Sequence, residues 1–425
     1  YIFETTTISP TCTFQSEVQL EPEEQSQDLI ISVKDNKGRL LVSFQPEVKK
    51  VEEIPDPAKP LPIPEELKTT EELFLAGLHL EQYRHATFAP DDYYLEGLKR
   101  DPKDIRINVA YGTLLLRRGL LKESEGYFRR AIESLTWRNP NPYDSEAYYQ
   151  LGLALKLQGK LKEAYSSFYK SVWSAAWQDS GYFSLSQIAC ANGAYGEALE
   201  LIEKSLSRNT RNNKARHLKT ALLRKSRRFN EAIAFAKESI LIDIADFGSY
   251  NEIYLVLKEQ GETVKAENVL DELQQLMRGD VHNHLHLAAD YIESGLYQEA
   301  IEILHRVTEG NRLYPMVHYT LAYLHEKLNL VDKAEFHRNN GNASSPDYCF
   351  PNTLLEMIVL EHVITMNPED DKAHYYLGNL LYDKKRHLDA IKHWEAAKSV
   401  NANFATVHRN LGLAYFNLLG DAEKS

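Results

Sequence analysis

The stretch "AYYQLGLALKLQGKLKEAYSSFYKSV" (residues 147–172) decides how this chain folds. Leu151 and Leu155 recur at helical spacing before its second glycine, and Ala164 and Phe168 do so after it. Apolar residues at this spacing predict an amphipathic helix on each side of the glycine. Glycine itself fits a helix C-terminus, because it adopts positive φ at little cost. The stretch therefore predicts two antiparallel helices joined by a tight turn.

The alanine of the second helix recurs every 34 residues through the middle of the chain. The ladder consists of Ala164, Ala198, Ala232, Ala266, Ala300 and Ala334. A fixed period of this length indicates stacked structural repeats. Such arrays present an extended surface rather than a single enclosed pocket.

These residues resemble the tetratricopeptide repeat, in which Leu-Gly, an aromatic residue, a turn glycine and an alanine hold fixed places within each repeat. Residues 147–172 and 373–397 match closely, whereas 212–245 matches weakly, with Thr220 in the usual glycine position and Arg227 in the turn. The resemblance implies a mainly α fold, a right-handed α-solenoid of helix-turn-helix repeats. We expect this solenoid to span residues 68–425.

The repeat spacing slips twice. Extra residues fall at "TWRNPNPYD" (136–144) and at "RNNGNASSPDYCFP" (338–351), and a helix at 353–366 restores the phase. Insertions in solenoids form loops, often on the binding face. These two segments are therefore the most individual parts of the array.

The N-terminal segment follows a different pattern. Residues 1–45 contain alternating apolar residues, and two strand-like runs flank Asp35-Asn36-Lys37-Gly38, which suits a β-turn. We expect a small antiparallel β segment of three or four strands, a remnant or edge of a β-sandwich. Residues 46–67 are rich in proline and predict an extended linker. Thr69 and Glu72 then predict a capping box where the helices begin.

Composition excludes several classes of function. The net charge of −12 and the absence of a basic stripe argue against nucleic-acid binding. Cys12, Cys190 and Cys349 lie too far apart for a CxxC metal motif and suit a reducing compartment, so we expect a cytoplasmic location. No apolar run is long enough to span a membrane. The chain starts at Tyr1 within a strand-like run, as an excised fragment would.

No catalytic motif is present: there is no GxSxG, HExxH or P-loop. We therefore expect that this segment is not an enzyme and needs no cofactor.

The sequence does contain candidate residues for binding. The first helix of each tetratricopeptide repeat lines the concave face, and in the C-terminal half this face is predicted to carry Tyr319, Tyr323, Tyr375, Asn379, Tyr382 and Arg409. Tyrosine and arginine dominate binding hot spots, because they combine apolar area with a polar tip. The alternative is that these aromatic residues fill space between helices.

The longer insertion offers Asp347, Tyr348 and Phe350, which could cap a bound partner. The alternative is a passive surface loop, since loop tips tolerate insertion.

Metal binding has weak candidates. His282 and His286 are four residues apart, which places them on one helix face at a zinc-ligand spacing. No third ligand is evident near them in the sequence, so we expect no metal. His284, His318, His374 and His408 share one repeat offset, which predicts packing between helices.

Several stretches resemble a narrower group, among them "WRNPNPYDSEAYYQLGLALK" (137–156) and "SVWSAAWQDSGYFSLSQIAC" (171–190). They are similar to the C-terminal half of large bacterial repeat proteins that carry an upstream β-sandwich domain of unknown function, similar in type to sugar-mutarotase sandwiches. The resemblance implies a neighbourhood in carbohydrate metabolism.

Two functions follow as hypotheses. The first is a scaffold that binds a peptide, a partner protein or its own upstream domain. The second is an accessory region of a carbohydrate-active protein that contacts a glycan or completes an upstream sugar site.

Overall fold

The computed structural model of the protein describes residues 2–9, 13–48, 54, 56–57, 60–83, 85, 87–308 and 314–425. Two compact units are present, Tyr1–Leu61 and Pro62–Ser425. Most of the predicted linker falls in the first unit, and its residues 49–53, 55, 58 and 59 lie outside the described residues.

The first unit contains an antiparallel hairpin of β1 (Ile31–Lys34) and β2 (Leu40–Phe44), preceded by the short 3-10 helix η1 (Ser26–Asp28). The predicted turn is confirmed. Gly38 has a φ of +81°, and the Asp35 carboxylate accepts hydrogen bonds from the backbone N–H groups of Lys37 and Arg39.

We predicted three or four strands, and among the described residues only these two form a sheet. Phe14 and Val18 alternate as strand residues would, yet both are exposed and belong to no sheet. Alternation makes a strand only where a partner edge supplies the ladder of hydrogen bonds, and a hairpin this small offers little apolar surface on which to build further strands.

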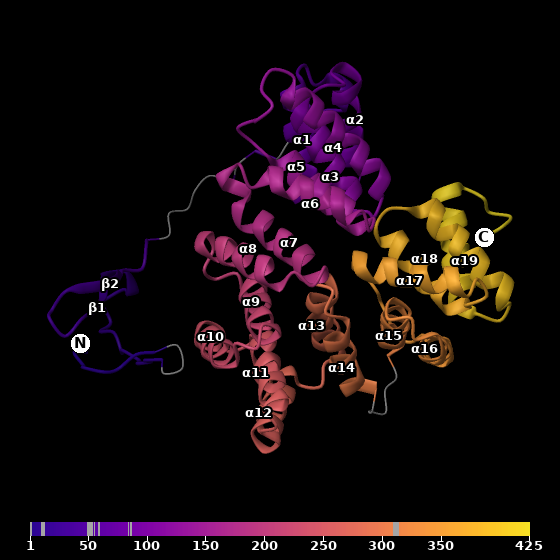
Figure 1. Cartoon of the computed structure of the whole chain (residues 1–425). Helices are drawn as coiled ribbons and strands as arrows, with labels where there is room; N and C mark the ends of the chain where they lie inside the picture. Colours follow the sequence, from indigo (N-terminus) through magenta and orange to yellow (C-terminus); the bar gives the residue numbers. More distant parts are fainter. Residues whose placement is uncertain are drawn as a thin grey trace. The chain divides into compact units, whose positions relative to one another are not determined.

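The second unit is a succession of antiparallel helix pairs (Figure 1). Its first half comprises the 3-10 helix η2 (Pro64–Glu66), α1 (Thr70–Gln82), α2 (Pro90–Arg100), α3 (Ile105–Arg117), α4 (Leu121–Thr136), α5 (Glu146–Leu157), α6 (Leu161–Ser171), the 3-10 helix η3 (Ala175–Trp177), α7 (Gln178–Ala191), α8 (Tyr195–Arg208), α9 (Asn213–Lys225) and α10 (Phe229–Ile242). Its second half comprises α11 (Phe247–Glu259), α12 (Thr263–Met277), α13 (Val281–Glu293), α14 (Tyr297–Thr308), α15 (Pro315–Lys327), α16 (Val331–Ala343), α17 (Leu354–Met366), α18 (Asp371–Asp383), α19 (His387–Val400), α20 (Ala405–Ala414) and the π-helical turn η4 (Tyr415–Leu419). None of the helices in the described ranges is both long and apolar enough to cross a bilayer.

Close contact between the two helices of a pair explains the small residues of the repeat. A Cβ added at Gly152 would lie 2.5 Å from the Phe168 ring, and one added at Gly378 would lie 2.5 Å from the Trp394 ring. The ladder alanines are also buried, with Ala164 fully inaccessible. Small side chains at these places let the helices pack closely, as the repeat pattern predicts.

From the α3–α4 pair onward, the turn within each pair keeps the same geometry even where glycine is missing. Gly159 has a φ of +76°, as predicted for a glycine ending a helix. Arg227, Asn329 and Lys385 take the same left-handed conformation at φ +57° to +63°. The weakly matching unit around Arg227 is therefore a normal helix pair.

Both insertions follow a complete helix pair and separate it from the next helix. The first lies between the end of α4 at Thr136 and the start of α5 at Glu146. In the second, residues 338–343 belong to α16, so the loop covers only 344–353. A capping box begins α1 at Thr69, as the sequence predicted, and another begins α17 at Thr353, where the phase-restoring helix was expected.

Candidate functional site

Two of the predicted groove residues do not lie on an open surface. Tyr319 is 0% exposed and its hydroxyl donates to Asp370 Oδ1 at 2.8 Å, while Tyr375 is 8% exposed and packs on Phe404. Both tyrosines fill space between helices, as the alternative interpretation held. The expectation that they face a ligand fails, because α18 and its neighbours cover them.

The other predicted groove residues are partly or fully exposed. Asn379 Oδ1 accepts a hydrogen bond from Trp394 Nε1 at 3.1 Å, and the half-buried Tyr382 packs on the same indole. Tyr323 is half-buried, and Arg409 is exposed. The structure therefore brings Asn379 and Tyr382 together but not the six residues as one site.

The chain covers part of its own inner face. Helix α13 lies against the first helices of earlier pairs, where Tyr291 packs edge-on against His217 with ring centroids 4.6 Å apart. The turn at Gly295 approaches the Ala191 backbone so closely that an added Cβ would lie 2.6 Å from its Cα. Polar contacts join the same surfaces, namely Gln187 Nε2 to Glu293 Oε2 at 3.2 Å and Lys214 Nζ to Asp290 Oδ1 at 2.7 Å. A partner cannot occupy this stretch of the face while α13 is in place.

A buried ionic network holds α13 and α14 there. Arg224 donates to Glu252 Oε2 at 2.7 Å and to Glu299 Oε1 at 2.9 Å, and all three side chains are nearly inaccessible. Burial alone would raise the pKa of Glu299, but the hydrogen bond from Lys225 and the charge of Arg224 hold that pKa below its usual value. Each carboxylate is paired, so the network is structural and supplies no free acid or base.

Aromatic side chains lie in the first insertion and on the segment after α6 that hydrogen-bonds to it, where the sequence analysis named no site residue. We call Trp137, Tyr143, Trp173 and Trp177 the tryptophan surface; it holds three of the four tryptophans of the chain. Trp137, Tyr143 and Trp173 are 76%, 99% and 55% exposed. Trp177 stacks on Tyr149 with ring centroids 4.8 Å apart, and its Nε1 donates to Asp144 Oδ1 of the insertion at 3.3 Å.

A shallow hollow of about 400 Å³ adjoins this surface between α4, α5 and α6. Its lining comprises Arg129, Ile132, Glu133, Tyr148, Leu151, Ser166, Ser167 and Lys170. Lys170 connects the hollow to the tryptophan surface, because its Nζ donates to Asn141 Oδ1 at 3.0 Å and lies 4.2 Å from the centre of the Trp173 ring. The insertion and the hollow therefore form one continuous surface.

The second insertion presents the residues that the sequence singled out. Cys349 is 1% exposed and fastens the loop to the core, where burial raises the pKa of its thiol to about 12. Its neighbours Tyr348 and Phe350 are 87% and 66% exposed, and Asp347 is also exposed. Tyr348 has a φ of +60°, which is uncommon for a bulky residue and marks local strain.

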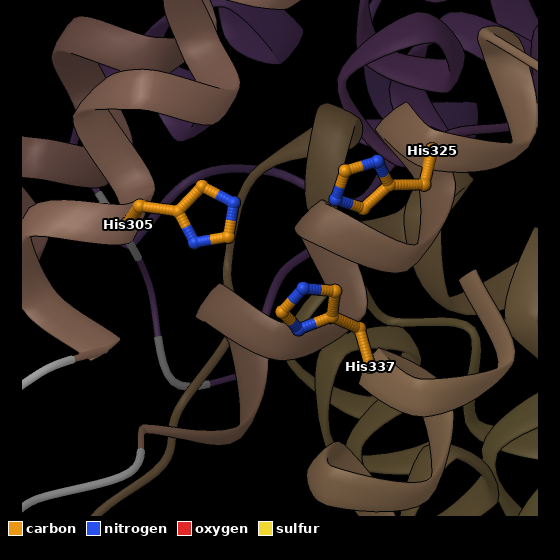
Figure 2. A group of neighbouring side chains, drawn as sticks. All are labelled: His305, His325 and His337. Carbon is orange, nitrogen blue, oxygen red and sulfur yellow. The ribbon is translucent and has the colours of Figure 1, made fainter. Parts of the chain in front are cut away.

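The histidines that gather are not the ones that the sequence favoured. His282 and His286 are exposed, and no third ligand joins them among the described residues. His305, His325 and His337 instead point toward a common space, with their ligand nitrogens all within 4.8 Å of one another (Figure 2). Spacings of 20 and 12 residues place them on three different helices, so no local motif could reveal the group.

Comparison with known families follows the division of the chain. Residues 145–172 match a model described as tetratricopeptide repeat, and residues 378–418 match one described as TPR repeat. Residues 1–44 match a third model, described as YphG-like protein, second domain.

Solved structures similar to this chain are also repeat proteins. YrrB, a TPR protein with an unusual peptide-binding site, is 16% identical over 45% of this chain and 96% of its own, with a TM-score of 0.38. A tetratricopeptide repeat protein from Parabacteroides merdae is 15% identical over 61% and 98%, with a TM-score of 0.41. The C-terminal part of a TPR repeat-containing protein from Cytophaga hutchinsonii is 12% identical over 65% and 95%, with a TM-score of 0.40. These similarities are too low to carry a ligand from one protein to another.

The two repeat-model matches agree with the structure itself. Helix pairs with a buried alanine and a left-handed turn recur at the 34-residue period of the sequence. A fold of this kind indicates a role in protein interaction or scaffolding, and nothing observed indicates catalysis. Residues 145–172 and 378–418 of this chain therefore match tetratricopeptide repeats, and the helix pairs of the structure share the anatomy of that repeat.

Proposed function

We propose that the chain is an interaction scaffold that binds an extended segment of a partner protein on the tryptophan surface and its adjoining hollow. The exposure of Trp137, Tyr143 and Trp173 carries this proposal. Large aromatic side chains are costly to leave in water, and clusters of them mark binding surfaces. Tryptophan and tyrosine also supply much of the energy at protein interfaces.

The chemistry of the hollow defines the partner segment. Ile132 and Leu151 line it and suit an apolar anchor side chain. On the tryptophan surface, Arg138 lies over the Trp137 ring at 4.5 Å. Neither Arg138 nor Lys170, which lines the hollow, pairs with a carboxylate in the part of the chain that the structure describes. Two cations without acidic partners favour a segment that carries Asp or Glu beside its anchor.

The self-covered inner face supports the same choice of surface. Helix α13 contacts the first helices of earlier pairs through Tyr291, Asp290 and Glu293. A partner that entered there would first have to displace this helix and expose the charged Arg224 network. The tryptophan surface requires no such rearrangement.

The second insertion is an alternative contact point, separate from the surface proposed here. Tyr348 and Phe350 extend outward from the anchored Cys349, and Asp347 adds a charge beside them. Of the groove residues, Tyr323, Asn379, Tyr382 and Arg409 retain exposed area for the same role. We rank this point second, because no hollow among the described pockets adjoins it.

A glycan is the second candidate ligand. Exposed indole and phenol rings beside Asn141 and Asp144 offer the combination of stacking faces and hydrogen-bonding groups that sugars use. This candidate occupies the same tryptophan surface and is separated from the first by experiment.

The test is selection of peptides from a random library displayed on phage against the intact chain. We expect enriched peptides to combine an apolar anchor with Asp or Glu, and we expect Trp137→Ala with Trp173→Ala to weaken their binding at least tenfold, about 1.4 kcal/mol. The matched control is Tyr348→Ala with Phe350→Ala, which removes two equally exposed aromatic residues elsewhere and should leave that binding unchanged.

Three results would count against the proposal. Peptides that bind all variants equally would show that the tryptophan surface is not the site. Loss in the control pair alone would move the site to the second insertion. Binding on a glycan array that disappears in Trp137→Ala, with no peptide enriched, would establish the glycan role instead.

A further inference from the structure

We propose that His305, His325 and His337 bind a divalent transition-metal ion of the zinc type. The three side chains come from α14, α15 and α16, and one nitrogen of each ring faces the space between them (Figure 2). This site is independent of the tryptophan surface and of the proposed partner.

The spacing of the nitrogens is close to that of a metal site. Zn–N bonds are about 2.1 Å long, so three nitrogens around one tetrahedral zinc lie about 3.4 Å apart. The ligand atoms of the three histidines are within 4.8 Å of one another without a metal. Small rotations of the side chains would close this difference, and no change in the helices is needed.

His325 carries the strongest evidence. It is 3% exposed, and both of its ring nitrogens are buried without any hydrogen-bond partner in the described structure. Buried polar atoms nearly always have a partner, so an unpaired pair of nitrogens requires an explanation. A metal ion bound by one nitrogen would supply it.

A neighbouring histidine orients one of the three ligands. His337 Nδ1 contacts His318 Nδ1 at 3.0 Å, so a proton on His337 Nδ1 can be donated to His318 and leave His337 Nε2 free to bind a metal. A partner of this kind on the second nitrogen fixes the tautomer of most metal-bound histidines.

The chain contains its own comparison. His374 and His393 repeat the His318–His337 contact 56 residues later, with Nδ1 atoms 2.9 Å apart. The place of His325 in that helix is taken by Leu381, and no three-ligand group forms there among the described residues. The paired histidines are thus a packing feature of both units, whereas the addition of His325 and His305 is specific to one.

Three imidazole ligands favour zinc, copper, nickel or iron over calcium or magnesium, which prefer oxygen. A zinc ion with three histidines keeps a fourth position open for water or another ligand. Because His305 belongs to one helix pair and His325 and His337 to the next, the ion would join two neighbouring repeats.

The experiment uses the intact chain without a polyhistidine tag, stripped with chelator and titrated with zinc by calorimetry. We expect one zinc per chain, a rise in the melting temperature on binding, and a visible spectrum of tetrahedral type with cobalt in place of zinc. The test variant is His325→Leu, which copies the residue found at the equivalent position, Leu381. It should fold without metal and lose zinc binding together with the thermal shift.

The control variant is His282→Ala with His286→Ala, which removes the exposed pair and should bind zinc as the unchanged chain does. Zinc binding that survives in His325→Leu, or that disappears in the control, would overturn the proposal, as would the absence of binding at micromolar zinc. Circular dichroism of metal-free His325→Leu separates loss of a ligand from loss of the fold.

Discussion

Replacing Arg224 with methionine tests how strongly the chain holds α13 and α14 against its earlier repeats. The guanidinium donates to Glu252 Oε2 at 2.7 Å and to Glu299 Oε1 at 2.9 Å, and Glu252 is 0% exposed. Methionine has nearly the same length but no charge, so among the described residues Glu252 keeps only the hydroxyl of Tyr291 as a donor, at 2.6 Å. The substitution thus leaves a buried carboxylate without its cation.

The size of the effect follows from the burial of each partner. Removing one member of a buried ion pair costs about 3–5 kcal/mol, and the inaccessible Glu252 accounts for most of it. Glu299 retains Lys225, and Glu259, at 41% side-chain exposure, contributes little. We therefore expect Arg224→Met to lower the free energy of unfolding by about 3–5 kcal/mol.

Urea denaturation measures the total loss in the free energy of unfolding. Hydrogen exchange of α9, α11 and α13 shows which helices are destabilised, since repeat arrays can open locally. The variant Arg224→Met with Glu252→Gln removes the stranded charge and keeps an acceptor for Tyr291, so it should recover about half of the loss or more. The control Arg228→Met breaks a pair whose partner Glu231 is exposed, so it should leave the free energy of unfolding nearly unchanged. A cost below about 1 kcal/mol for Arg224→Met, or a double variant no better than the single one, would refute this account.

Two further predictions concern packing and pH. Gly152→Ala places a methyl group 2.5 Å from the inaccessible Phe168 ring and should lower the free energy of unfolding, measured by urea denaturation, by about 1–3 kcal/mol. The control Gly126→Ala lies on a helix with open space around it and should raise that free energy by up to about 1 kcal/mol. Equal effects of the two substitutions would contradict the close-packing argument. Burial, and then His374, lower the pKa of His393 to about 4 from an ordinary 6.5. The unfolded chain therefore binds a proton at this residue before the folded chain does, so the stability that neutral His393 provides is complete above pH 6.5 and is lost as the pH falls toward 4. Between pH 6.5 and pH 4 the free energy of unfolding of the unchanged chain, measured by urea denaturation at each pH, should fall by up to roughly 3 kcal/mol more than that of His393→Leu. If the free energy of unfolding depends on pH in the same way in both proteins, His393 is not responsible.

The helix pairs could be predicted because their determinants are local. Gly152, Phe168 and Ala164 lie within one repeat, and each repeat buries its apolar face mainly against its neighbours. The same local origin explains why the unit around Arg227 folds normally, since the left-handed turn persists when glycine is replaced. The N-terminal strands were predicted less well, because Phe14 and Val18 require a pairing edge that the local sequence does not contain.

The candidate sites were predictable only in part. The slip in spacing identified the loop of Tyr348 and Phe350, and their exposure agrees with a surface loop. The same slip marked residues 136–144, but Trp173 and Trp177 lie beyond them in the sequence. An unusual concentration of tryptophan around the insertion was the available signal.

By itself, the sequence determined the repeat, its length, the buried ladder and the two interruptions, because each depends on contacts within one unit or between adjacent units. Only the tertiary structure decided which surfaces remain open. Tyr319 and Tyr375 have the residue types of a binding face but are buried, and α13 covers the first helices of repeats far earlier in the chain. The tertiary structure also brought His305, His325 and His337 together. Such contacts depend on how each pair is rotated against the next, and this accumulated rotation is set by packing along the whole array rather than by any one repeat.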